Sequence, residues 1–235
     1  MGEYQEIIAI IALGMGSAWA SGINLYAAIL VLGVMGMNGD IILPPDLQVL
    51  ASPIVIAAAG LMYIVEFTAD KIPGVDSSWD ALHTLVRVPA GAMLAAGAVG
   101  DMNPAIVIAS GILGGGVSLA THAAKSGSRV LINTSPEPVT NWTASIMEDI
   151  AVFTGMWAAL VHPELFIVFF ILFILLLIWI LPKLWKGIKK VFSFISNKFS
   201  RDEVITEDSH VNIPPENNST NKKEPLLNLD KKNVK

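Results

Sequence analysis

The sequence predicts an all-α protein, a polytopic helical membrane bundle with about six spans. Hydrophobic residues make up 53% of the 235 residues and charged residues only 15%, a composition typical of chains that face lipid. The apolar residues fall in runs about as long as a helix that crosses a bilayer. Connectors rich in Pro, Gly, Asn and Asp separate these runs.

The first apolar run extends from Ile7 to Met37 without a charged residue. Because a crossing helix needs only about 20 residues, we expect this run to bend or break. Gly22 and Asn24 mark the place, since glycine weakens a helix and asparagine brings a polar amide into hydrocarbon. The sequence leaves two outcomes open, a single kinked crossing or a re-entrant hairpin that returns to the side of entry.

Five further runs are predicted to cross the membrane. They are residues 47–70, 79–100, 105–124, 142–161 and 165–181. Turn-forming residues fill the connectors between them, and only the connector at 126–141 is long. Pro89 interrupts the third of the six spans, so we expect a kink there.

The basic residues predict an orientation. If the first run crosses once, the connectors at 38–46, 101–104 and 162–164 share one side. Their charged residues are all acidic: Asp40, Asp46, Asp101 and Glu164. The basic residues Lys71, Lys125 and Arg129 and the C-terminal tail lie on the other side. Lys and Arg favour the cytoplasm, so we expect a cell inner membrane protein with both termini cytoplasmic. A re-entrant hairpin would move the N-terminus to the outside.

Three domains follow from this pattern. Residues 1–182 form the transmembrane domain. The segment from Lys183 to Arg201 holds six basic and no acidic residues, with apolar residues at helical spacing, which predicts a basic amphipathic interfacial helix on the anionic inner leaflet. A plain flank of the last span is the alternative. Residues 202–235 are polar, and we expect a disordered cytoplasmic tail.

Charged groups inside the spans are costly and usually face a bundle interior. Asp80, His83 and Arg87 share one helical face, since they stand at i, i+3 and i+7. Glu148 and Asp149 in the fifth span lie at a similar depth, so we expect Arg87 to pair with one of them. The predicted polar pathway comprises Asn24, Glu66, Asp70, Asp80, His83, Arg87, Glu148 and Asp149. Ion pairs that only lock the helices together are the alternative.

Other polar residues near the inner side receive different interpretations. Lys71, Lys125 and Arg129 are expected to bind an anion or a lipid headgroup. His122 is expected to be an interfacial histidine. The small residues before it, Gly111, Gly115 and Ser118, predict close helix packing.

The sequence contains no cysteine, which excludes disulfides, thiolate metal sites and cysteine nucleophiles. It also lacks the zinc, nucleophile-elbow, P-loop and dinucleotide motifs. We therefore expect no enzyme activity, no cofactor, no metal site and no nucleic-acid partner. Membrane lipids are the expected partners, and copies of the chain could associate.

Two connectors look like distant copies of each other. Ala69-Asp70-Lys71 precedes Trp79-Asp80-Ala81, and Ala123-Ala124-Lys125 precedes Trp142-Thr143-Ala144. Both copies run in the same direction, which suggests a parallel internal repeat. Transporters often place their site where two repeats meet.

Several longer motifs point to a family. They are Gly22-Ile23-Asn24-Leu25-Tyr26, Leu43-Pro44-Pro45, Val65-Glu66-Phe67, Asp70-Lys71-Ile72-Pro73-Gly74-Val75-Asp76, Trp79-Asp80 with His83-Thr84, and Asn133-Thr134-Ser135-Pro136-Glu137-Pro138 with Asn141-Trp142. Over about residues 17–182 the chain resembles the bacterial membrane-protein family described as domain of unknown function 4126. The resemblance implies a compact multi-span domain, and it assigns no catalytic or binding role.

These observations favour a small transporter or channel for an ion or small polar solute. The alternative from another class is a protein that flips anionic lipid or organises the membrane without solute transport. The charged pathway supports the first interpretation, and the basic residues of the inner side support the second.

The tail gives a first testable prediction. A peptide of residues 183–201 should bind vesicles of anionic lipid, because each Lys or Arg near such a surface contributes about 1 kcal/mol. Binding measured by vesicle co-sedimentation should weaken as salt rises, since salt screens the attraction. Zwitterionic vesicles are the control. Binding that ignored both salt and lipid charge would contradict an electrostatic contact.

Overall fold

A computed structural model describes residues 2–72, 74–100, 102–134 and 138–211 of the chain. The helices are α1 (Glu3–Asn38), the 3-10 helix η1 (Pro45–Ala51), α2 (Pro53–Ala69), α3 (Val75–Ala98), α4 (Pro104–Ile132), α5 (Pro138–Val161) and α6 (Pro163–Val211). The protein is all-α, as predicted. Five helices are long and apolar enough to cross a membrane, and η1 with α2 makes a sixth candidate.

The helix α1 is broken at Asn24, which has the non-helical angles φ −147° and ψ 98°. Residues 3–23 run antiparallel to α3, because Gly14 lies against Ala98 and the Ser21 hydroxyl donates to the Arg87 carbonyl. Residues 25–38 run antiparallel to α2, because Gly33 lies against Ile56 and Leu30 lies against Gly60. Since α2 and α3 point in opposite directions, the two arms of α1 do as well.

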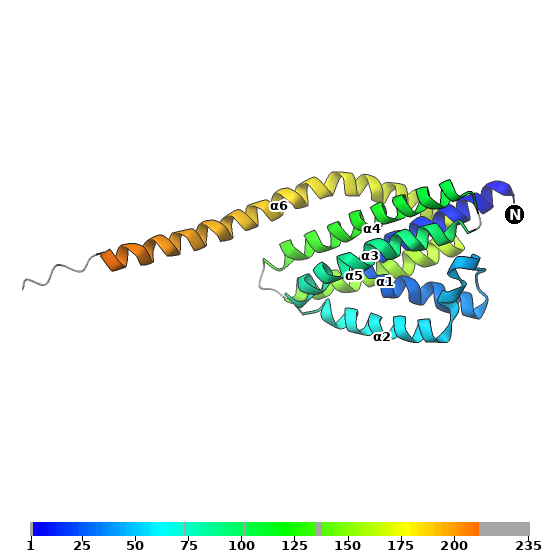
Figure 1. Ribbon diagram of the computed structural model, residues 1–235, viewed down its shortest axis with the longest axis horizontal. Coiled ribbons are helices and arrows are strands. Elements are labelled where there is room, and N and C mark those ends of the chain that lie inside the picture. The colour runs from blue at the N-terminus through cyan, green and yellow to red at the C-terminus, as the bar shows by residue number, and fades with distance from the viewer. Residues whose placement is uncertain (1, 73, 101, 135–137, 212–235) are drawn as a thin grey trace, which may run out of the picture. The chain divides into compact units, whose positions relative to one another are not determined.

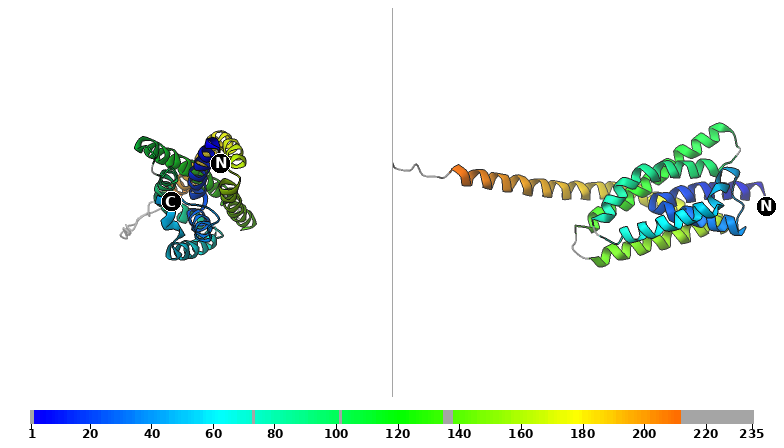
Figure 2. Two further views of the ribbon diagram at one scale, coloured as in Figure 1. Left: turned by 90° about the vertical axis from the view of Figure 1, so that its right-hand side faces the viewer. Right: turned by 60° about the horizontal axis from the view of Figure 1, so that its bottom comes forward.

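The first segment is therefore a re-entrant hairpin with its tip at Asn24. Figures 1 and 2 show the N-terminus and the connector after α1 at the same end of the bundle. At 1.5 Å per residue, the arm of residues 25–38 is about 21 Å long, too short for the roughly 30 Å hydrocarbon core. Of the two outcomes that the sequence left open, the structure has the hairpin.

The remaining long helices, α2 to α6, run in alternating directions along the bundle. Each of η1 and α2 begins with a proline, Pro45 and Pro53, and these two helices meet at an angle of 67°. The helix α3 contains Pro89, and α4 extends to Ile132, beyond the predicted end at residue 124. The helices α3 and α4 pack along their length, and α5 packs mainly against α1.

Small residues allow the hairpin to enter the bundle. A Cβ on Gly22 would approach the Ser118 carbonyl oxygen at 2.5 Å and Thr121 Cβ at 2.8 Å. Any larger residue at this position would therefore push the tip away from α4. The predicted close packing along α4 is present, and it serves the hairpin as well as α3.

The chain divides into two compact units, residues 1–192 and residues 193–235. The first unit holds the bundle. The second unit is helical through Val211, and the predicted division into an interfacial helix and a disordered tail from residue 202 stays a prediction. The rest of that tail, residues 212–235, lies outside the described residues.

The hairpin corrects the predicted topology. Phe166 of α6 lies beside Gly16, and Gly187 of α6 lies beside Leu131 of α4, so α6 runs away from the end that carries the N-terminus. A single crossing of the first segment, with both termini on one side, was the wrong expectation. The break at Asn24 reverses the chain, so α1 begins and ends at the same end of the bundle.

Reporter fusions test this topology. A reporter before Glu3 and a reporter after Leu181 should read as opposite sides of the membrane, and the one after Leu181 should read as cytoplasmic because the basic residues lie at that end. A reporter at Asn103 is the control and should agree with the N-terminal fusion. Two termini on the same side would show that α1 crosses.

Candidate functional site

Polar side chains from α1 to α5 meet inside the bundle, and we call them the polar network. The members are Asn24, Glu66, Asp70, Asp80, His83, Arg87, His122, Lys125, Arg129, Glu148 and Asp149. All of them are buried except the Glu148 side chain, which is 20% exposed. The structure thus brings every residue of the predicted pathway into one network.

Arg87 lies at the centre of α3 and is fully buried. Its guanidinium donates from Nη2 to Glu66 Oε1 of α2 and from Nη1 to Asp80 Oδ1, 2.9 Å away on its own helix. The expected pairing with Glu148 or Asp149 was wrong. The helix α3 packs against α4, whereas α5 packs mainly against α1, so the nearest carboxylates come from α2 and α3.

His122 is buried on α4 and contacts Arg87, so the expected interfacial position was wrong. Arg87 Nη1 lies 2.9 Å from His122 Nδ1. A guanidinium can only donate, so Nδ1 accepts and the ring proton is on Nε2, which lies 2.7 Å from Thr84 Oγ1. The contact with Arg87 therefore holds His122 neutral and in one tautomer.

Lys125 forms the densest part of the network, which we call the Lys125 cluster. The ammonium donates to Asp70 Oδ2 at 2.8 Å and to the Ile23 carbonyl at 3.0 Å. Three more carboxylate oxygens lie within 4 Å of the ammonium. They belong to Glu66 at 3.6 Å, Asp80 at 3.7 Å and Glu148 at 3.7 Å. Four carboxylates from three helices thus surround one positive charge.

Arg129 lies one turn beyond the Lys125 cluster on α4. It donates to both oxygens of Glu148, from Nη2 at 2.6 Å and from Nε at 3.3 Å. Its Nη1 also donates to the carbonyls of Asp70 and Asn141, each at 3.1 Å. This two-point contact joins α5 to α4 and to the end of α2.

These contacts correct the expectation for the inner-side basic residues. Lys125 and Arg129 were expected to face lipid headgroups, and both are buried and paired. Because α4 continues as a helix past residue 124, it carries both side chains inside the bundle. Lys71 is half-buried, with its ammonium over the Phe67 ring and 3.4 Å from Ser145 Oγ.

Asn24 links the hairpin tip to α5. Its Nδ2 donates to Asp149 Oδ1 at 3.2 Å, and its Oδ1 accepts from the Ala27 amide at 3.0 Å. The second bond caps the start of the second arm of α1, as asparagine does at helix N-termini. The same side chain thus ends the break in the helix and brings Asp149 into the network.

Two further contacts lie at the end of the network that is next to the connector between α2 and α3. His83 Nε2 lies 3.2 Å from the Tyr26 hydroxyl of the hairpin, and the His83 ring stacks on Trp79. Asp76 accepts from Asn133 at the end of α4 and from the Gly74 amide. The bonds of Asp76 hold the connector between α2 and α3 against α4.

The network holds more acid than base. Its carboxyl groups, with the neighbouring one of Asp76, number six: Glu66, Asp70, Asp76, Asp80, Glu148 and Asp149. The basic groups number four: Lys71, Arg87, Lys125 and Arg129. One oxygen each of Glu66, Asp70, Asp80 and Asp149 is buried without a hydrogen-bond partner among the described residues. Two excess carboxyl groups need protons or a cation, because a bare charge at this depth is costly.

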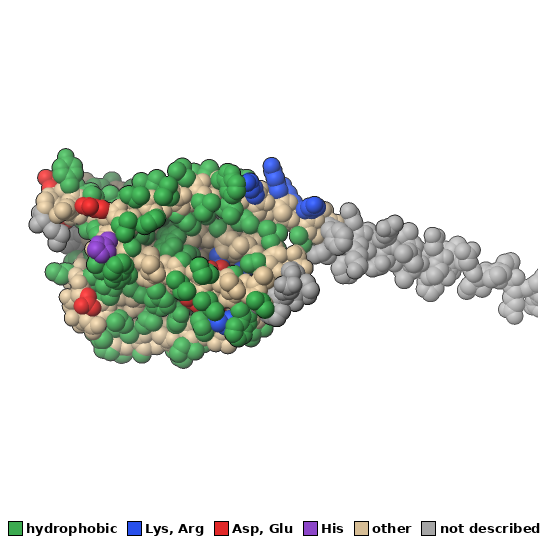
Figure 3. All heavy atoms as spheres, turned by 180° about the vertical axis from the view of Figure 1, so that it is seen from behind, with side chains coloured by type: hydrophobic (Ala, Val, Ile, Leu, Met, Phe, Trp, Pro, Cys, Tyr) green, Lys and Arg blue, Asp and Glu red, His purple; other side chains and the backbone are tan. Residues whose placement is uncertain are grey.

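Many large hydrophobic side chains are exposed on the outside of the bundle, such as Leu82, Leu85 and Ile112. A cavity of about 320 Å³ between α3 and α4 is lined by Ser77, Thr84, His122 and Ser126 among others. Acidic and basic side chains are visible in the middle of the mostly hydrophobic surface that Figure 3 shows. Within the described part of the chain, no group of three or more His, Asp or Glu side chains is arranged to hold a metal ion.

The spacing of the basic residues along α4 also indicates that they face the inside of the bundle, although the sequence-based prediction placed them at the lipid headgroups. His122, Lys125 and Arg129 stand at i, i+3 and i+7, the same spacing that Asp80, His83 and Arg87 define on α3. A shared face of this kind predicts that all three side chains point into the bundle. Asn141 is also buried, and it contacts Arg129 and the Asp70 carbonyl.

Comparison with known families places this network in context. Residues 11–183 match the family described as Domain of unknown function (DUF4126). The chain belongs to this family. The DUF4126 region covers α1 from residue 11 onward, α2 to α5 and the apolar part of α6, and it therefore contains the whole network. No curated protein and no solved structure matches the chain.

Arg87 gives a prediction about the stability of this DUF4126 protein. Arg87→Ala should destabilise the bundle by about 3–5 kcal/mol, because it leaves buried carboxylates without their partner. Adding Glu66→Gln should restore much of the stability, since removing both partners costs less than removing one. Thermal unfolding in detergent measures both effects. Asp149→Asn is the matched control and should not restore stability. If Asp149→Asn restored the stability of Arg87→Ala and Glu66→Gln did not, Arg87 would pair with Asp149 and not with Glu66.

Proposed function

We propose that this protein is a small transporter or channel, and not an enzyme, and that a cation, protons included, crosses through the Lys125 cluster. The observation that carries this proposal is the meeting of four carboxylates with the broken tip of a re-entrant helix. Buried ionisable groups of this kind usually mark ion pathways and proton relays in membrane bundles.

The charge balance supports a cation over an anion. Two carboxyl groups exceed the basic groups of the network, and four carboxylate oxygens point at no donor among the described residues. A passing cation or proton would neutralise this excess, whereas an anion would add to it. The Lys125 ammonium already occupies the position between Asp70 and the Ile23 carbonyl. A mobile cation must therefore displace this ammonium from the carboxylates, or bind when the ammonium moves away.

The hairpin supports the same function. Broken helices line the sites of many transporters, because the carbonyls at the end of a half-helix attract cations. The first arm of α1 ends at Ile23, whose carbonyl accepts from Lys125. The partial negative charge of this helix end therefore adds to the carboxylates around Lys125.

A specific observation also favours the lipid-flipping alternative. The cavity between α3 and α4 has the side chains of Ser77, Thr84 and His122 in its otherwise mostly apolar lining. On this alternative a lipid would use the cavity with its headgroup at these polar side chains. The burial of Lys125 and Arg129 weighs against this alternative, because both were the expected headgroup contacts and both are already paired.

Flux through proteoliposomes tests the proposal. Vesicles that contain the full chain should dissipate gradients of protons or monovalent cations faster than empty vesicles. Lys125→Met should lower the flux, because the carboxylates then hold a bound cation too tightly to release it. We expect a reduction of about tenfold or more, which corresponds to a barrier raised by ~1.4 kcal/mol. Lys186→Met, at an exposed lysine of α6, is the matched control and should keep the flux.

The same vesicles separate the alternatives. A fluorescent anionic lipid in the inner leaflet reports lipid flipping when a quencher is added outside. Ion flux without lipid movement supports the proposed function. Lipid movement without ion flux, or equal ion flux in empty vesicles, would overturn it. Lys125→Arg, which keeps the charge, provides a second variant if Lys125→Met does not fold.

A further inference from the structure

Asp149 differs from the other carboxyl groups of the polar network, because it has no ion pair among the described residues. It lies midway along α5 and is 8% exposed. Its Oδ1 accepts from Asn24 Nδ2 at 3.2 Å, and its Oδ2 is buried without a hydrogen-bond partner in the described part of the chain. A carboxyl group in this position lacks the partners that an ionised form needs.

Each of the other four carboxyl groups of the network has two basic groups within 4.0 Å, and Lys125 is one of the two in every case. An opposite charge at this distance favours the ionised form of a carboxyl group. These four groups are therefore carboxylates. They are Glu66 and Asp80, which share Arg87 as the second partner, and Asp70 and Glu148, which share Arg129.

Asp76 is compensated by amide donors instead of a cation. It lies in the first turn of α3. Its carboxylate accepts from the backbone amides of Gly74 at 2.9 Å and Ser77 at 2.6 Å, and from Asn133 Nδ2 at 2.9 and 3.0 Å. Amide donors and the positive end of a helix dipole both stabilise a carboxylate. Asp76 is therefore accommodated as an ion at the end of the bundle.

The charges inside the bundle then balance if Asp149 carries a proton. The four carboxylates with ion pairs match the four basic groups Lys71, Arg87, Lys125 and Arg129. An ionised Asp149 would add a fifth negative charge at a buried position, where a bare charge is costly. A neutral acid also fits the observed contacts, with Oδ1 as the carbonyl that accepts from Asn24 and Oδ2 as the hydroxyl.

Further ionisable groups lie near Asp149 without forming an ion pair with it in the described part of the chain. They are Tyr63 and Asp70 of α2, Lys71 after α2 and Lys125 of α4. Lys71 is half-buried in the connector between α2 and α3, and its ammonium lies 3.4 Å from Ser145 Oγ. Ser145 precedes Asp149 by one turn of α5, so Lys71 and Ser145 mark an approach for protons from this end of the bundle.

The contact with Asn24 favours a proton over a metal ion at Asp149. The orientation of the Asn24 amide is fixed, because its Oδ1 accepts from the Ala27 amide at 3.0 Å. Asn24 therefore presents Nδ2, a donor, to Asp149. A metal ion such as Ca²⁺ requires several oxygen ligands around one point, whereas a proton requires only the one free oxygen, Oδ2.

We infer that the mobile cation of the proposed function is the proton, and that Asp149 is the residue that takes it up and releases it. A proton from one aqueous side adds to Oδ2 and converts the carboxylate into the neutral acid. Its departure to the other side restores the carboxylate. The bond to Asn24 places this exchange at the tip of the hairpin, next to the Ile23 carbonyl that binds Lys125. The inference rests on the proposed function and names its ion.

Infrared spectroscopy of the full chain in detergent tests the protonation of Asp149 without measuring transport. The carbonyl stretch of a neutral carboxyl group is separate from the bands of a carboxylate. We expect a neutral-acid band at neutral pH that Asp149→Asn removes. Asparagine has the shape of the neutral acid and can still accept from Asn24, so this variant should keep the thermal stability of the wild type.

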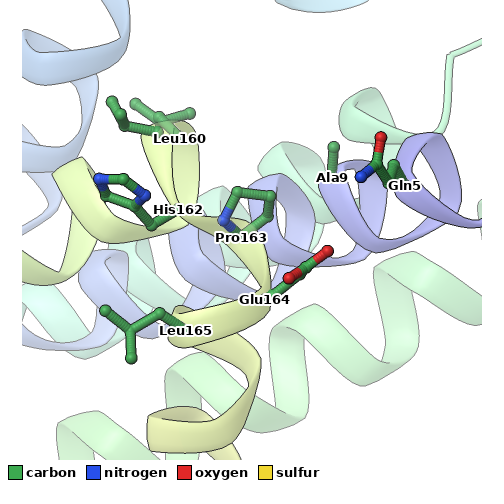
Figure 4. Close-up of a pocket in the computed structure, with 8 residues that line it drawn as sticks. Gln5, Ala9, Leu160, His162, Pro163, Glu164 and Leu165 are labelled. Carbon is green, nitrogen blue, oxygen red and sulfur yellow. The ribbon is translucent and has the colours of Figure 1, made fainter. Parts of the chain in front are cut away.

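Glu164 provides the matched control, because it is an exposed acid outside the network. It lines a cavity of about 490 Å³ where α5 turns into α6. In Figure 4 its carboxylate extends from the first turn of α6 towards the arm of α1 that carries Gln5 and Ala9. Glu164→Gln should leave the neutral-acid band unchanged. If Asp149→Asn does not fold, labelling the aspartates of the wild type with a heavy carbon isotope should shift the band, and labelling the glutamates should not.

Flux through proteoliposomes tests the identity of the ion. The full chain should dissipate a proton gradient, and Asp149→Asn should lower this proton flux by about tenfold or more, because asparagine cannot carry the proton. Asp149→Glu, which keeps an acid at this position, should retain proton flux. Glu164→Gln should keep the proton flux of the wild type.

The outcomes separate the inference from the proposed function. Absence of a neutral-acid band, or a band that survives Asp149→Asn, would overturn the inference, because Asp149 would then not hold the proton. Flux of sodium or potassium ions without proton flux would also overturn it and would leave the proposed function in place. Absence of flux for every cation would overturn the proposed function, and the infrared band would still decide whether Asp149 is neutral.

Discussion

The ammonium group of Lys125 lies where water does not solvate it, and much of the bundle follows from the partners that it needs. A charge at such a depth costs several kcal/mol unless opposite charges and hydrogen bonds surround it. The partners come from α2, α3 and α5 and from the tip of α1. Only an arrangement that brings these four elements around α4 satisfies the charge.

The re-entrant hairpin depends on the same polar interior. A helix that ends inside a membrane leaves carbonyl and amide groups without helical partners. Here the Ile23 carbonyl accepts from Lys125, and Asn24 caps the second arm while it binds Asp149. The network thus stabilises the break in α1, and the break in turn supplies the network with a carbonyl and an amide. Loss of either would be expected to disturb both.

Local rules were enough for the sequence to predict several of these features. The excess length of the first apolar run and its asparagine predicted the break at Asn24, and the i, i+3, i+7 spacing predicted that Asp80, His83 and Arg87 face inwards. Both depend only on helix geometry and on the cost of polar groups in lipid. The burial of Lys125 and Arg129 was not predicted, because hydropathy places the end of a span at its first charge, whereas α4 continues to Ile132.

The sequence by itself determined that the chain is a membrane bundle, where its helices are interrupted and which faces are polar, because these properties follow from composition and periodicity within one helix. Only the tertiary structure decided that α1 returns to its side of entry and that Arg87 pairs with Glu66 and not with the carboxylates of α5. The reason is that partners are set by which helices are neighbours and how each is rotated about its axis. Depth along a helix restricts these choices, and the packing of small residues such as Gly22 against α4 fixes them.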